Sequence, residues 1–387
     1  MSERERRPSV LVVSYSPLVM DARVLRQARE LSRYANVTTA GFGQAPIEGV
    51  DHVELEDLAP YTGGMLARVR YALGFILGRF RTITDRNLRD ADAERRLAGR
   101  RWDLVMANDV TALALAARLP SAYGFIADLH EFSPRQAEES LKFRLTESRY
   151  FAWLLRTYLP RASAVLTVSE GIGDAYRRTF GVECTIVTNA AGYVDSSPSD
   201  VGEVLRVVHS AAPSPARRIE VMIDAAVATS TPMTLDLYLV DDGGEYIRQL
   251  SERASRTERV TIRPAVPQSE LVEVLSRYDI GVHVLPPINF NHTWALPNKL
   301  FDYIQARLGL VIGPSPEMQR IVEDFEVGAV AEDFSVEALT RTFDSLDTAT
   351  VWSWKRASHA AARVLSAENQ MARLSEVVQG VLAGEKK

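Results

Sequence analysis

The sequence predicts an α/β protein with two doubly wound domains, each built on a parallel sheet. Short apolar runs alternate with amphipathic helical segments along nearly the whole chain, as in successive βαβ units. A stretch rich in turn-forming residues, 192–200, interrupts this alternation, which restarts after it. The length of 387 residues agrees with two domains, because a single hydrophobic core stops growing near ~250–300 residues.

The first domain opens with an all-apolar run, residues 10–14, which is typical of a parallel strand buried on both faces. The next segment, 22–34, carries Val24, Ala28 and Leu31 at helical spacing. Further strands are predicted at 37–42, 103–107, 124–127, 164–168 and 184–187. Polar loop residues and a helical pattern follow these strands, which completes a chain of βα units.

The second domain repeats the pattern. Strands are predicted at 205–210, 235–240, 260–262, 280–285 and 310–313, and helices at 219–228, 269–278, 299–307 and 336–346. A long helical pattern over 352–380 closes the chain. We therefore divide the sequence into a first domain, 1–191, a linker, 192–203, a second domain, 204–365, and a C-terminal helix, 366–387, that can return to the first domain.

The composition excludes several classes of protein. The formal charge is 45 − 50 = −5 and the pI is about 5.8, which argues against a general nucleic-acid binder. The single cysteine, Cys184, excludes a disulfide framework and a Cys-rich zinc site, and it fits a reducing cytoplasm. The charged N-terminus leads directly into a strand and not into a signal peptide. The longest apolar runs are shorter than the ~20 residues of a membrane span.

Motifs for common nucleotide and metal sites are incomplete. The run Gly-Ile-Gly-Asp-Ala-Tyr at 171–176 has tyrosine where the dinucleotide-binding fingerprint needs a third glycine, and no Gly-Lys-Ser/Thr phosphate loop occurs. The two aspartates at 241–242 precede Gly-Gly and indicate a tight turn, so no metal site is expected. Asp90 and Asp92 lie in a charged helical run that we interpret as a solvated face.

The ends of the predicted strands carry the candidate functional residues of the first domain. Ligands of open parallel sheets bind outside the carboxyl ends of the strands, so we expect a site in a cleft between the domains. His130 and Glu131 follow the strand ending at 127, where a histidine can serve proton transfer or hydrogen bonding. A structural histidine is the alternative. Asp21 opens the helix after the first strand and is either a helix cap or a site residue.

The run Leu-Pro-Asn-Lys-Leu-Phe-Asp-Tyr at 296–303 is the densest signal in the second domain. Its proline suits a first helical position, which places Asn298 and Lys299 in the first turn. A helix N-terminus beside a lysine is suited to bind phosphate, and Asp302, one turn further, has acceptors suited to a ribose diol. A capped helix with a surface lysine is the alternative. Arg217, before the first helix of the domain, adds a second cation.

Residues 65–101 form a basic segment within an acidic protein, with a local charge of 10 − 4 = +6. An apolar helical stripe between 65 and 80 is predicted to pack on the sheet. The opposite side of this helix carries two arginines and two aromatic residues, Arg68, Tyr71, Phe75 and Arg79. Aromatic rings interleaved with arginines indicate a second surface that contacts an acceptor or anionic lipid headgroups.

In their order along the chain, these motifs resemble the retaining GT-B glycosyltransferases of family four. The resemblance covers residues 10–346 and is most specific between 296 and 318. It is based on Asp21-Ala-Arg23-Val24, Asp128-Leu-His130-Glu131, Val168-Ser169-Glu170, Asn189, Arg217 and the run 296–303.

This resemblance implies GT-B architecture, with two Rossmann-like domains facing across a cleft. It also implies a transferase that moves a sugar, with retention, from a nucleotide diphosphate donor to an acceptor, without a metal or other cofactor. The second domain would hold the donor, with Arg217 on the diphosphate and Asp302 on the ribose. The first domain would bind the acceptor, with His130 near the transferred sugar.

Three sites depart from the family pattern. Arg307 and Gly309 stand where the usual Ala-Gly-Leu-Pro run has glycine and proline. Trp294 stands where a donor-binding glutamate is common, and Asn291 and His292 lie close enough in sequence to substitute for it. Ala211 and Ala212 replace a Gly-Arg pair, so one phosphate-binding charge is missing. These departures leave the identity of the donor open.

We therefore expect a cytoplasmic glycosyltransferase of bacterial surface-polysaccharide or glycolipid synthesis, with a glycan or lipid-linked acceptor at the inner face of the membrane and no nucleic-acid partner. Two alternatives stay open. One is a non-catalytic nucleotide-sugar or glycan-binding protein, which Trp294 and the missing arginine favour. The other is a sugar-nucleotide epimerase, which shares the architecture but would need acid–base carboxylates around the sugar.

Overall fold

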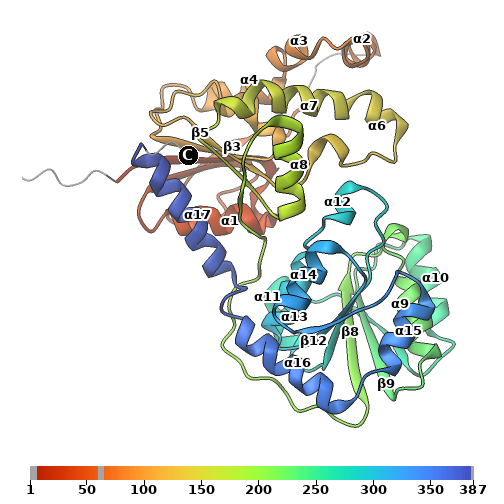
Figure 1. Cartoon of the computed structure of the whole chain (residues 1–387). Helices are drawn as coiled ribbons and strands as arrows, with labels where there is room; N and C mark the ends of the chain where they lie inside the picture. Colours follow the sequence, from red (N-terminus) through yellow and green to blue (C-terminus); the bar gives the residue numbers. More distant parts are fainter. Residues whose placement is uncertain (1–6, 60–64, 385–387) are drawn as a thin grey trace, which may run out of the picture. The chain divides into compact units, whose positions relative to one another are not determined.

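The computed structural model describes residues 7–59 and 65–384, and for residues 65–68 it describes the backbone alone. Contacts divide the chain into two compact units. The first runs to Thr188 and adds Asn289–Asn291 and the chain from Met371 onward. The second comprises Asn189–Ile288 and His292–Gln370. Each unit is a parallel sheet flanked by helices (Figure 1).

In the described part of the first unit, seven strands pair in parallel in the order β3-β2-β1-β4-β5-β6-β7. The strands are β1 (Ser9–Pro17), β2 (Asn36–Phe42), β3 (Asp51–Leu55), β4 (Leu104–Asn108), β5 (Phe125–Leu129), β6 (Ala164–Thr167) and β7 (Thr185–Ile186). The helices are α1 (Ala22–Leu31), α2 (Met65–Ile76), α3 (Phe80–Asp85), α4 (Leu88–Arg96), α5 (Leu113–Ala116), α6 (Leu141–Leu145), α7 (Glu147–Tyr158) and α8 (Glu170–Phe180). Short 3-10 turns occupy Leu18–Met20, Val110–Ala112, Ser133–Arg135 and Leu159–Arg161.

The last helix, α17 (Ala367–Leu382), completes the core of the first unit. Its Leu374 and Val378 are fully buried in one hydrophobic cluster with Ala28 and Leu31 of α1. Figure 1 shows the two helices side by side on one face of the sheet. The helical pattern over 352–380 is thus two helices, because α16 (Thr348–Ala361) ends before α17 begins.

The second unit repeats the design with a six-stranded sheet, counted over the described residues, in the order β10-β9-β8-β11-β12-β13. Its strands are β8 (Leu205–Ala211), β9 (Met233–Leu239), β10 (Val260–Pro264), β11 (Ile280–His283), β12 (Gly309–Ile312) and β13 (Gly328–Val330). Its helices are α9 (Ile219–Ala228), α10 (Glu245–Ala254), α11 (Gln268–Leu275), α13 (Asn298–Gln305), α14 (Pro316–Asp324), α15 (Val336–Asp344) and α16, with a 3-10 turn at Pro215–Arg217. The short helix α12 (Phe290–Thr293) has its first two residues in the first unit and its last two in the second.

Both strand orders reverse direction at one point, between β1 and β4 in the first sheet and between β8 and β11 in the second. This is the topology of the doubly wound fold, so the predicted fold class is confirmed for each unit. Strands β3 and β13 lie at sheet edges and escaped prediction, because polar residues interrupt the apolar pattern of β3 and β13 is only three residues long. The reversal points are the places where open sheets bind their ligands.

Candidate functional site

In the first unit, a buried ion pair lies at the carboxyl end of β5. Arg23 of α1 donates from Nε and Nη2 to the two carboxylate oxygens of Asp128, both at 2.7 Å, and Gln27 donates to the same carboxylate. Burial alone would raise the pKa of Asp128, but the charge of Arg23 and the neighbouring His130 outweigh it and hold that pKa well below its ordinary value. Asp128 is therefore a fixed negative charge beneath the site.

His130 is in contact with the carboxylate of Asp128. Its Nε2 lies 3.3 Å from Oδ2 of Asp128, and its side chain is 30% exposed. The carboxylate orients the ring, and the exposed part of the ring remains accessible to a ligand. The structure therefore gives His130 a partner that sequence reasoning did not assign.

Glu131 follows His130, and its pKa is raised by desolvation and by the carboxylate of Asp109. Asp109 directly follows β4 and has a positive φ of 71° although it is not glycine, a strained conformation that concentrates at functional sites. Sequence reasoning missed Asp109. The polar pair Asn108-Asp109 after an apolar strand was the available signal.

The side chains of Asp21 and Asn291 both form hydrogen bonds within the first unit. Asp21 caps α1, because its carboxylate accepts from the backbone N–H of Val24 at 3.2 Å. Asn291 belongs by its contacts to the first unit. Its Oδ1 accepts from the backbone N–H of Phe132 at 2.9 Å, and its Nδ2 lies 3.4 Å from Oε2 of Glu131.

In the second unit, two cations influence each other near the ends of β8 and β11. Desolvation, together with the positive charge of Arg217, lowers the pKa of Lys299 to about 8, and the charge of Asp302 offsets only part of this effect. Desolvation also lowers the pKa of Arg217, whose Nη1 donates to the carbonyl of Ala212 at 3.2 Å. The two cations thus lie in surroundings that disfavour their charge.

Helix α13 begins at Asn298, so Asn298 and Lys299 lie in its first turn as predicted, whereas Pro297, expected at the first helical position, is the N-cap residue. The N-cap residue, Pro297, makes no side-chain cap hydrogen bond, so backbone N–H groups of the first turn can bind an anion. Asn298 is exposed, whereas Asp302 is buried, with Nε2 of Gln268 3.5 Å from its Oδ1.

The positions that depart from the family pattern lie near these elements. Ala211 ends β8 and Ala212 follows it. His292 and Trp294, both half-buried, lie just before α13, and the positive field around His292 also lowers the pKa of the buried His283. Over the described ranges, no group of three or more His, Cys, Asp or Glu side chains is arranged to hold a metal ion.

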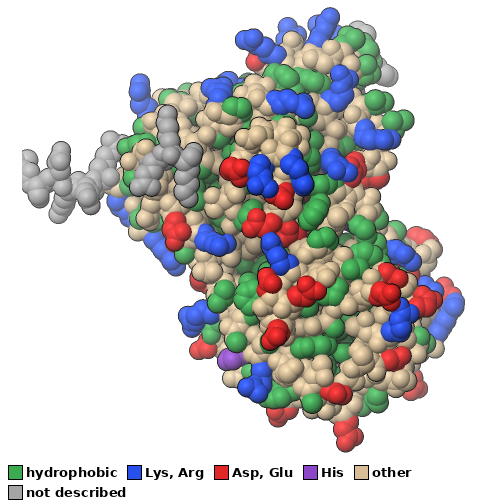
Figure 2. All heavy atoms as spheres, in the orientation of Figure 1, with side chains coloured by type: hydrophobic (Ala, Val, Ile, Leu, Met, Phe, Trp, Pro, Cys, Tyr) green, Lys and Arg blue, Asp and Glu red, His purple; other side chains and the backbone are tan. Residues whose placement is uncertain are grey.

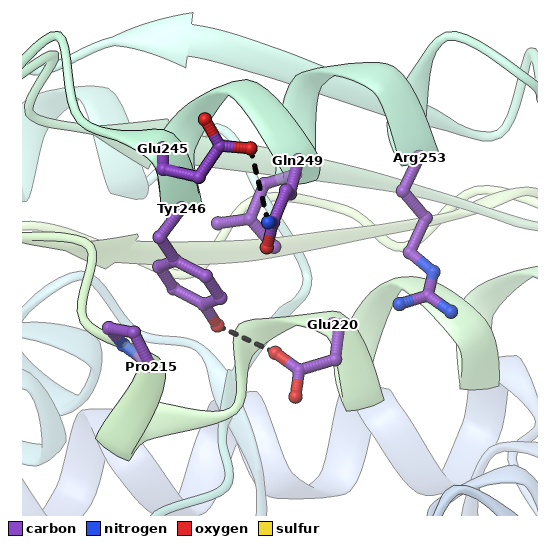
Figure 3. A pocket seen from close by; sticks show the side chains of 7 residues that line it. Pro215, Glu220, Glu245, Tyr246, Gln249 and Arg253 are labelled. Atoms are coloured by element: carbon purple, nitrogen blue, oxygen red, sulfur yellow. Dashed lines mark hydrogen bonds between the residues drawn. The ribbon is translucent and has the colours of Figure 1, made fainter.

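A pocket of about 450 Å³ lies on the other side of α9, between that helix and α10 (Figure 3). Its lining side chains already have partners: Tyr246 donates to Glu220 at 2.6 Å, Glu245 pairs with Arg248, and Arg253 pairs with Asp224 at 2.9 Å. The polar side chains of this pocket are thus already paired within the protein. We therefore place the candidate site at the strand ends instead.

The basic segment of the first unit is oriented differently from the prediction. Phe75, expected on the outer side of its helix, is buried and packs edge-on against Tyr150 with ring centroids 5.3 Å apart. Tyr71 is half-buried beside Phe75. Of the residues expected to pack on the sheet, Phe80 is buried, but Val69, Leu73, Ile76 and Leu77 are exposed, at 46–62%.

The prediction for Phe75 was therefore wrong, because this helix is apolar on both sides and its periodicity cannot choose between them. Arg79 is exposed, as expected. The side chain of Arg68 lies outside the described residues. No helix within the described ranges combines the length and the hydropathy of a membrane span.

No protein-family model and no curated protein matches the chain, but solved structures do. Sucrose-phosphate synthase from Thermosynechococcus elongatus superimposes with a TM-score of 0.74 at 12% sequence identity, over 98% of this chain and 100% of that one. HepE from Anabaena, solved with UDP and glucose, gives a TM-score of 0.65 at 16% identity, over 96% and 100% of the two chains. WaaG, a glycosyltransferase involved in lipopolysaccharide biosynthesis, gives 0.64 at 12%, over 96% and 100%.

The chain has the GT-B fold. This agrees with the architecture that the sequence motifs implied. At such low identities the likeness is one of fold, so any conclusion about activity of this GT-B chain comes from the residues at the strand ends.

Proposed function

We propose that this GT-B chain is a glycosyltransferase that moves a sugar, with retention, from a nucleoside diphosphate sugar to a glycan or lipid-linked acceptor. The observation that carries the proposal is the pair of cations, Arg217 and Lys299, in desolvated surroundings beside the uncapped start of α13. An anion relieves such a pair, and a diphosphate supplies charge and acceptors at once. Asp302, one turn along α13, is suited to the ribose.

The same residues would assist the chemistry. When the bond between the sugar and the diphosphate breaks, negative charge grows on the leaving diphosphate. Arg217, Lys299 and the N–H groups of α13 stabilise that charge where it develops, and we propose that they do so without a metal. Reaction on the front face of the sugar, with retention, requires no protein nucleophile. In the first unit His130, oriented by Asp128, would position the acceptor or the transferred sugar.

The neighbours support a nucleotide-sugar donor. HepE has been solved with UDP and with UDP-glucose, which makes UDP the first nucleotide to test. The nucleoside diphosphates of the other bases and their sugars complete the panel. Binding to the native state raises the melting temperature by mass action, so a thermal-shift screen ranks them directly.

The test compares three variants that each remove one positive charge from the second unit. Arg217→Ala and Lys299→Ala should abolish the thermal shift caused by the selected nucleotide, and Arg217→Ala should lower the transfer rate by about 10²–10³. Arg248→Ala is the matched control, because Arg248 is exposed on α10 and pairs with Glu245. Equal shifts in all three variants would contradict the proposal.

Product analysis separates the proposed activity from the two alternatives. Transfer of sugar to an acceptor supports it. Saturable nucleotide binding without turnover on any acceptor would indicate a non-catalytic binding protein. Conversion of the donor to its epimer in the absence of an acceptor would indicate an epimerase.

Exposed apolar residues on α2 favour a lipid-linked acceptor. Leu73, Ile76 and Leu77 are 46–62% exposed, and α6 adds Leu141 and Leu145 at 62% and 54%. Exposed arginines and lysine lie among them, namely Arg70, Arg79, Arg81, Lys142, Arg144 and Arg149. Figure 2 shows basic and hydrophobic side chains gathered over α2, α3 and α6, at the top of the view.

This combination suits peripheral contact with anionic lipid at the inner face of a bacterial membrane, during synthesis of surface polysaccharide or glycolipid. Leu73→Ser together with Leu77→Ser should weaken sedimentation with phosphatidylglycerol vesicles about 10-fold. The control, Val227→Ser with Val364→Ser, removes equally exposed apolar side chains from the second unit. Unchanged sedimentation of the first pair would contradict membrane contact.

A further inference from the structure

Two buried histidines lie at the reversal point of the second sheet. His209 is in β8 and His283 ends β11, the two strands between which the strand order reverses. Their rings are stacked, with centroids 5.4 Å apart and an interplanar angle of 12°, and the residues are only 1% and 4% exposed. Open parallel sheets bind their ligands at this position.

The ring of His209 takes a place between the two strands. Strands β8 and β11 pair through Val207 with Ile280 and through Val208 with Gly281. One residue further, His209 Nδ1 lies 2.8 Å from the carbonyl of Val282 and donates its hydrogen to it. This bond fixes the tautomer of His209, so its Nε2 is an acceptor, and Nε2 has no partner within the described residues.

His283 has no hydrogen-bond partner at either ring nitrogen in the described part of the chain. A neutral imidazole carries one donor and one acceptor, and buried polar atoms in native proteins are almost always paired. Two unpaired nitrogens on one buried ring, stacked on a second ring with an unpaired nitrogen, therefore indicate that something outside the protein completes the bonds.

The charges around the rings indicate what that is. Burial, together with the charges of Lys299 and Arg217, lowers the pKa of His209 to about 3. Burial lowers the pKa of His283 as well, again with contributions from Lys299 and Arg217. Both rings are neutral at pH 7, and both lie within the field of the two cations that we assigned to the diphosphate.

We propose that His283 donates a ring N–H to a phosphate oxygen of the nucleoside diphosphate, with His209 as the positioning residue that holds the ring of His283 by stacking. This inference depends on the proposed function, because it uses the same diphosphate. A neutral donor adds a directed hydrogen bond without adding a third positive charge to Arg217 and Lys299. Residues that contact the phosphate would then come from strand β11 as well as from helix α13.

The direct test is NMR of the wild-type chain labelled with ¹⁵N-histidine, titrated with inorganic pyrophosphate and then with UDP. The six histidine residues of the chain keep the spectrum simple, and His283→Gln assigns the signal. We expect the ring nitrogens of His283 to shift on addition of either ligand. A spectrum in which the His283 nitrogens stay unchanged while the protein binds UDP would overturn the inference.

Variants give a second measurement. His283→Phe keeps a flat ring without nitrogens and should weaken UDP binding about 10-fold or more by calorimetry, since a hydrogen bond to a charged group is lost. His283→Gln, which keeps an N–H donor, should recover part of the affinity. If His283→Phe does not fold, the NMR titration of the wild type still decides.

Lys299→Ala separates the two proposals. Loss of UDP binding in Lys299→Ala, with unchanged binding in a folded His283→Phe variant, would overturn the role of His283 and leave the diphosphate site intact. A wild-type chain that binds neither pyrophosphate nor any nucleoside diphosphate would refute the proposed function itself. Loss of binding in both variants, with the His283 shift in the wild type, supports both.

Discussion

The carboxyl ends of the two sheets differ in how their charges are compensated. In the first unit, Arg23 neutralises the charge of Asp128, Gln27 donates a hydrogen bond to the same carboxylate, and His130 contacts it as well. In the second unit, Arg217 and Lys299 lie in desolvated surroundings together with the unpaired ring of His283. A network whose polar groups are all hydrogen-bonded within the protein holds a functional side chain in place. A network with unpaired polar groups gains its missing partners when a ligand binds.

The comparison predicts, first, that breaking the network of the first unit costs stability. Arg23→Met leaves the carboxylate of Asp128 buried and uncompensated, so the free energy of unfolding should fall by about 3–5 kcal/mol. Urea unfolding measures it. Arg29→Met is the matched control, because Arg29 is exposed on the same helix and should change stability by less than about 0.5 kcal/mol. A similar small change in both variants would break the comparison.

Second, His130→Ala should lower the transfer rate about 100-fold, as expected for loss of a group that transfers a proton or positions a reactant. It should leave UDP affinity unchanged, because the diphosphate belongs to the second unit. Steady-state kinetics with calorimetry distinguishes the two effects. A large loss of UDP affinity would assign His130 to the donor instead.

Third, the affinity for UDP should depend on pH through Lys299, whose pKa is about 8. Lys299 is a cation below this pH and neutral above it, so affinity should hold at pH 7 and fall about 10-fold for each pH unit above 8. Lys299→Arg keeps its charge and should show a flat profile up to pH 10. A flat profile in the wild type would mean that Lys299 does not contact the anion.

The low pKa of Asp128 predicts a pH dependence in the opposite direction, in which stability is lost at low pH. Its contribution to stability is present above the pKa of an unfolded aspartate, near ~3.9, and is lost as the pH falls further. The first unit should therefore weaken in acid, while the ligand affinity of the second unit falls in base. The melting temperature without ligand and calorimetry with UDP, each measured against pH, test the two halves of this statement.

The smallest effect concerns Asp21. Asp21→Asn keeps an oxygen that accepts from the backbone of Val24 and removes the charge. Because the structure uses this side chain as a cap, we expect stability within about 0.5 kcal/mol of the wild type and an unchanged transfer rate. A loss of rate beyond 10-fold would show that the carboxylate acts in the reaction, which is the alternative that the sequence left open.

Much of the fold could be predicted because its signals are local. The apolar run 205–210 became β8, the helix expected at 219–228 has those bounds, and Asn298 and Lys299 lie in the first turn of α13 as predicted. Buried parallel strands need continuous apolar runs, and helix starts need particular residues, so both leave marks within a few positions of the sequence.

Burial of polar residues was harder to predict. Asp90, interpreted as part of a solvated face, is buried and accepts from Tyr15 at 2.5 Å and from Arg118 at 2.7 Å. Asp92, in the same interpretation, is buried against Arg96. An aspartate that is buried with a distant arginine has the same sequence neighbours as one in water, so no local pattern separates the two.

The orientation of α2 and the stacking of the two histidines could not be predicted from the sequence for a related reason. Helix α2 has apolar residues on both sides, so only its contact with Tyr150 on α7 decides that Phe75 points inward. His209 and His283 are 74 residues apart in the sequence, and each is a single histidine in an apolar strand. Their stacking exists only because β8 and β11 become neighbours.

By itself, the sequence determined the order of strands and helices, the two-domain division and the start of the 296–303 helix, since periodicity and turn chemistry act over a few residues. Tertiary structure alone decided which charges are neutralised and which are left for a ligand. The free energy of a buried charge depends on its neighbours in space, and Asp128 with Arg23, or Lys299 with Arg217, become neighbours only in the folded chain.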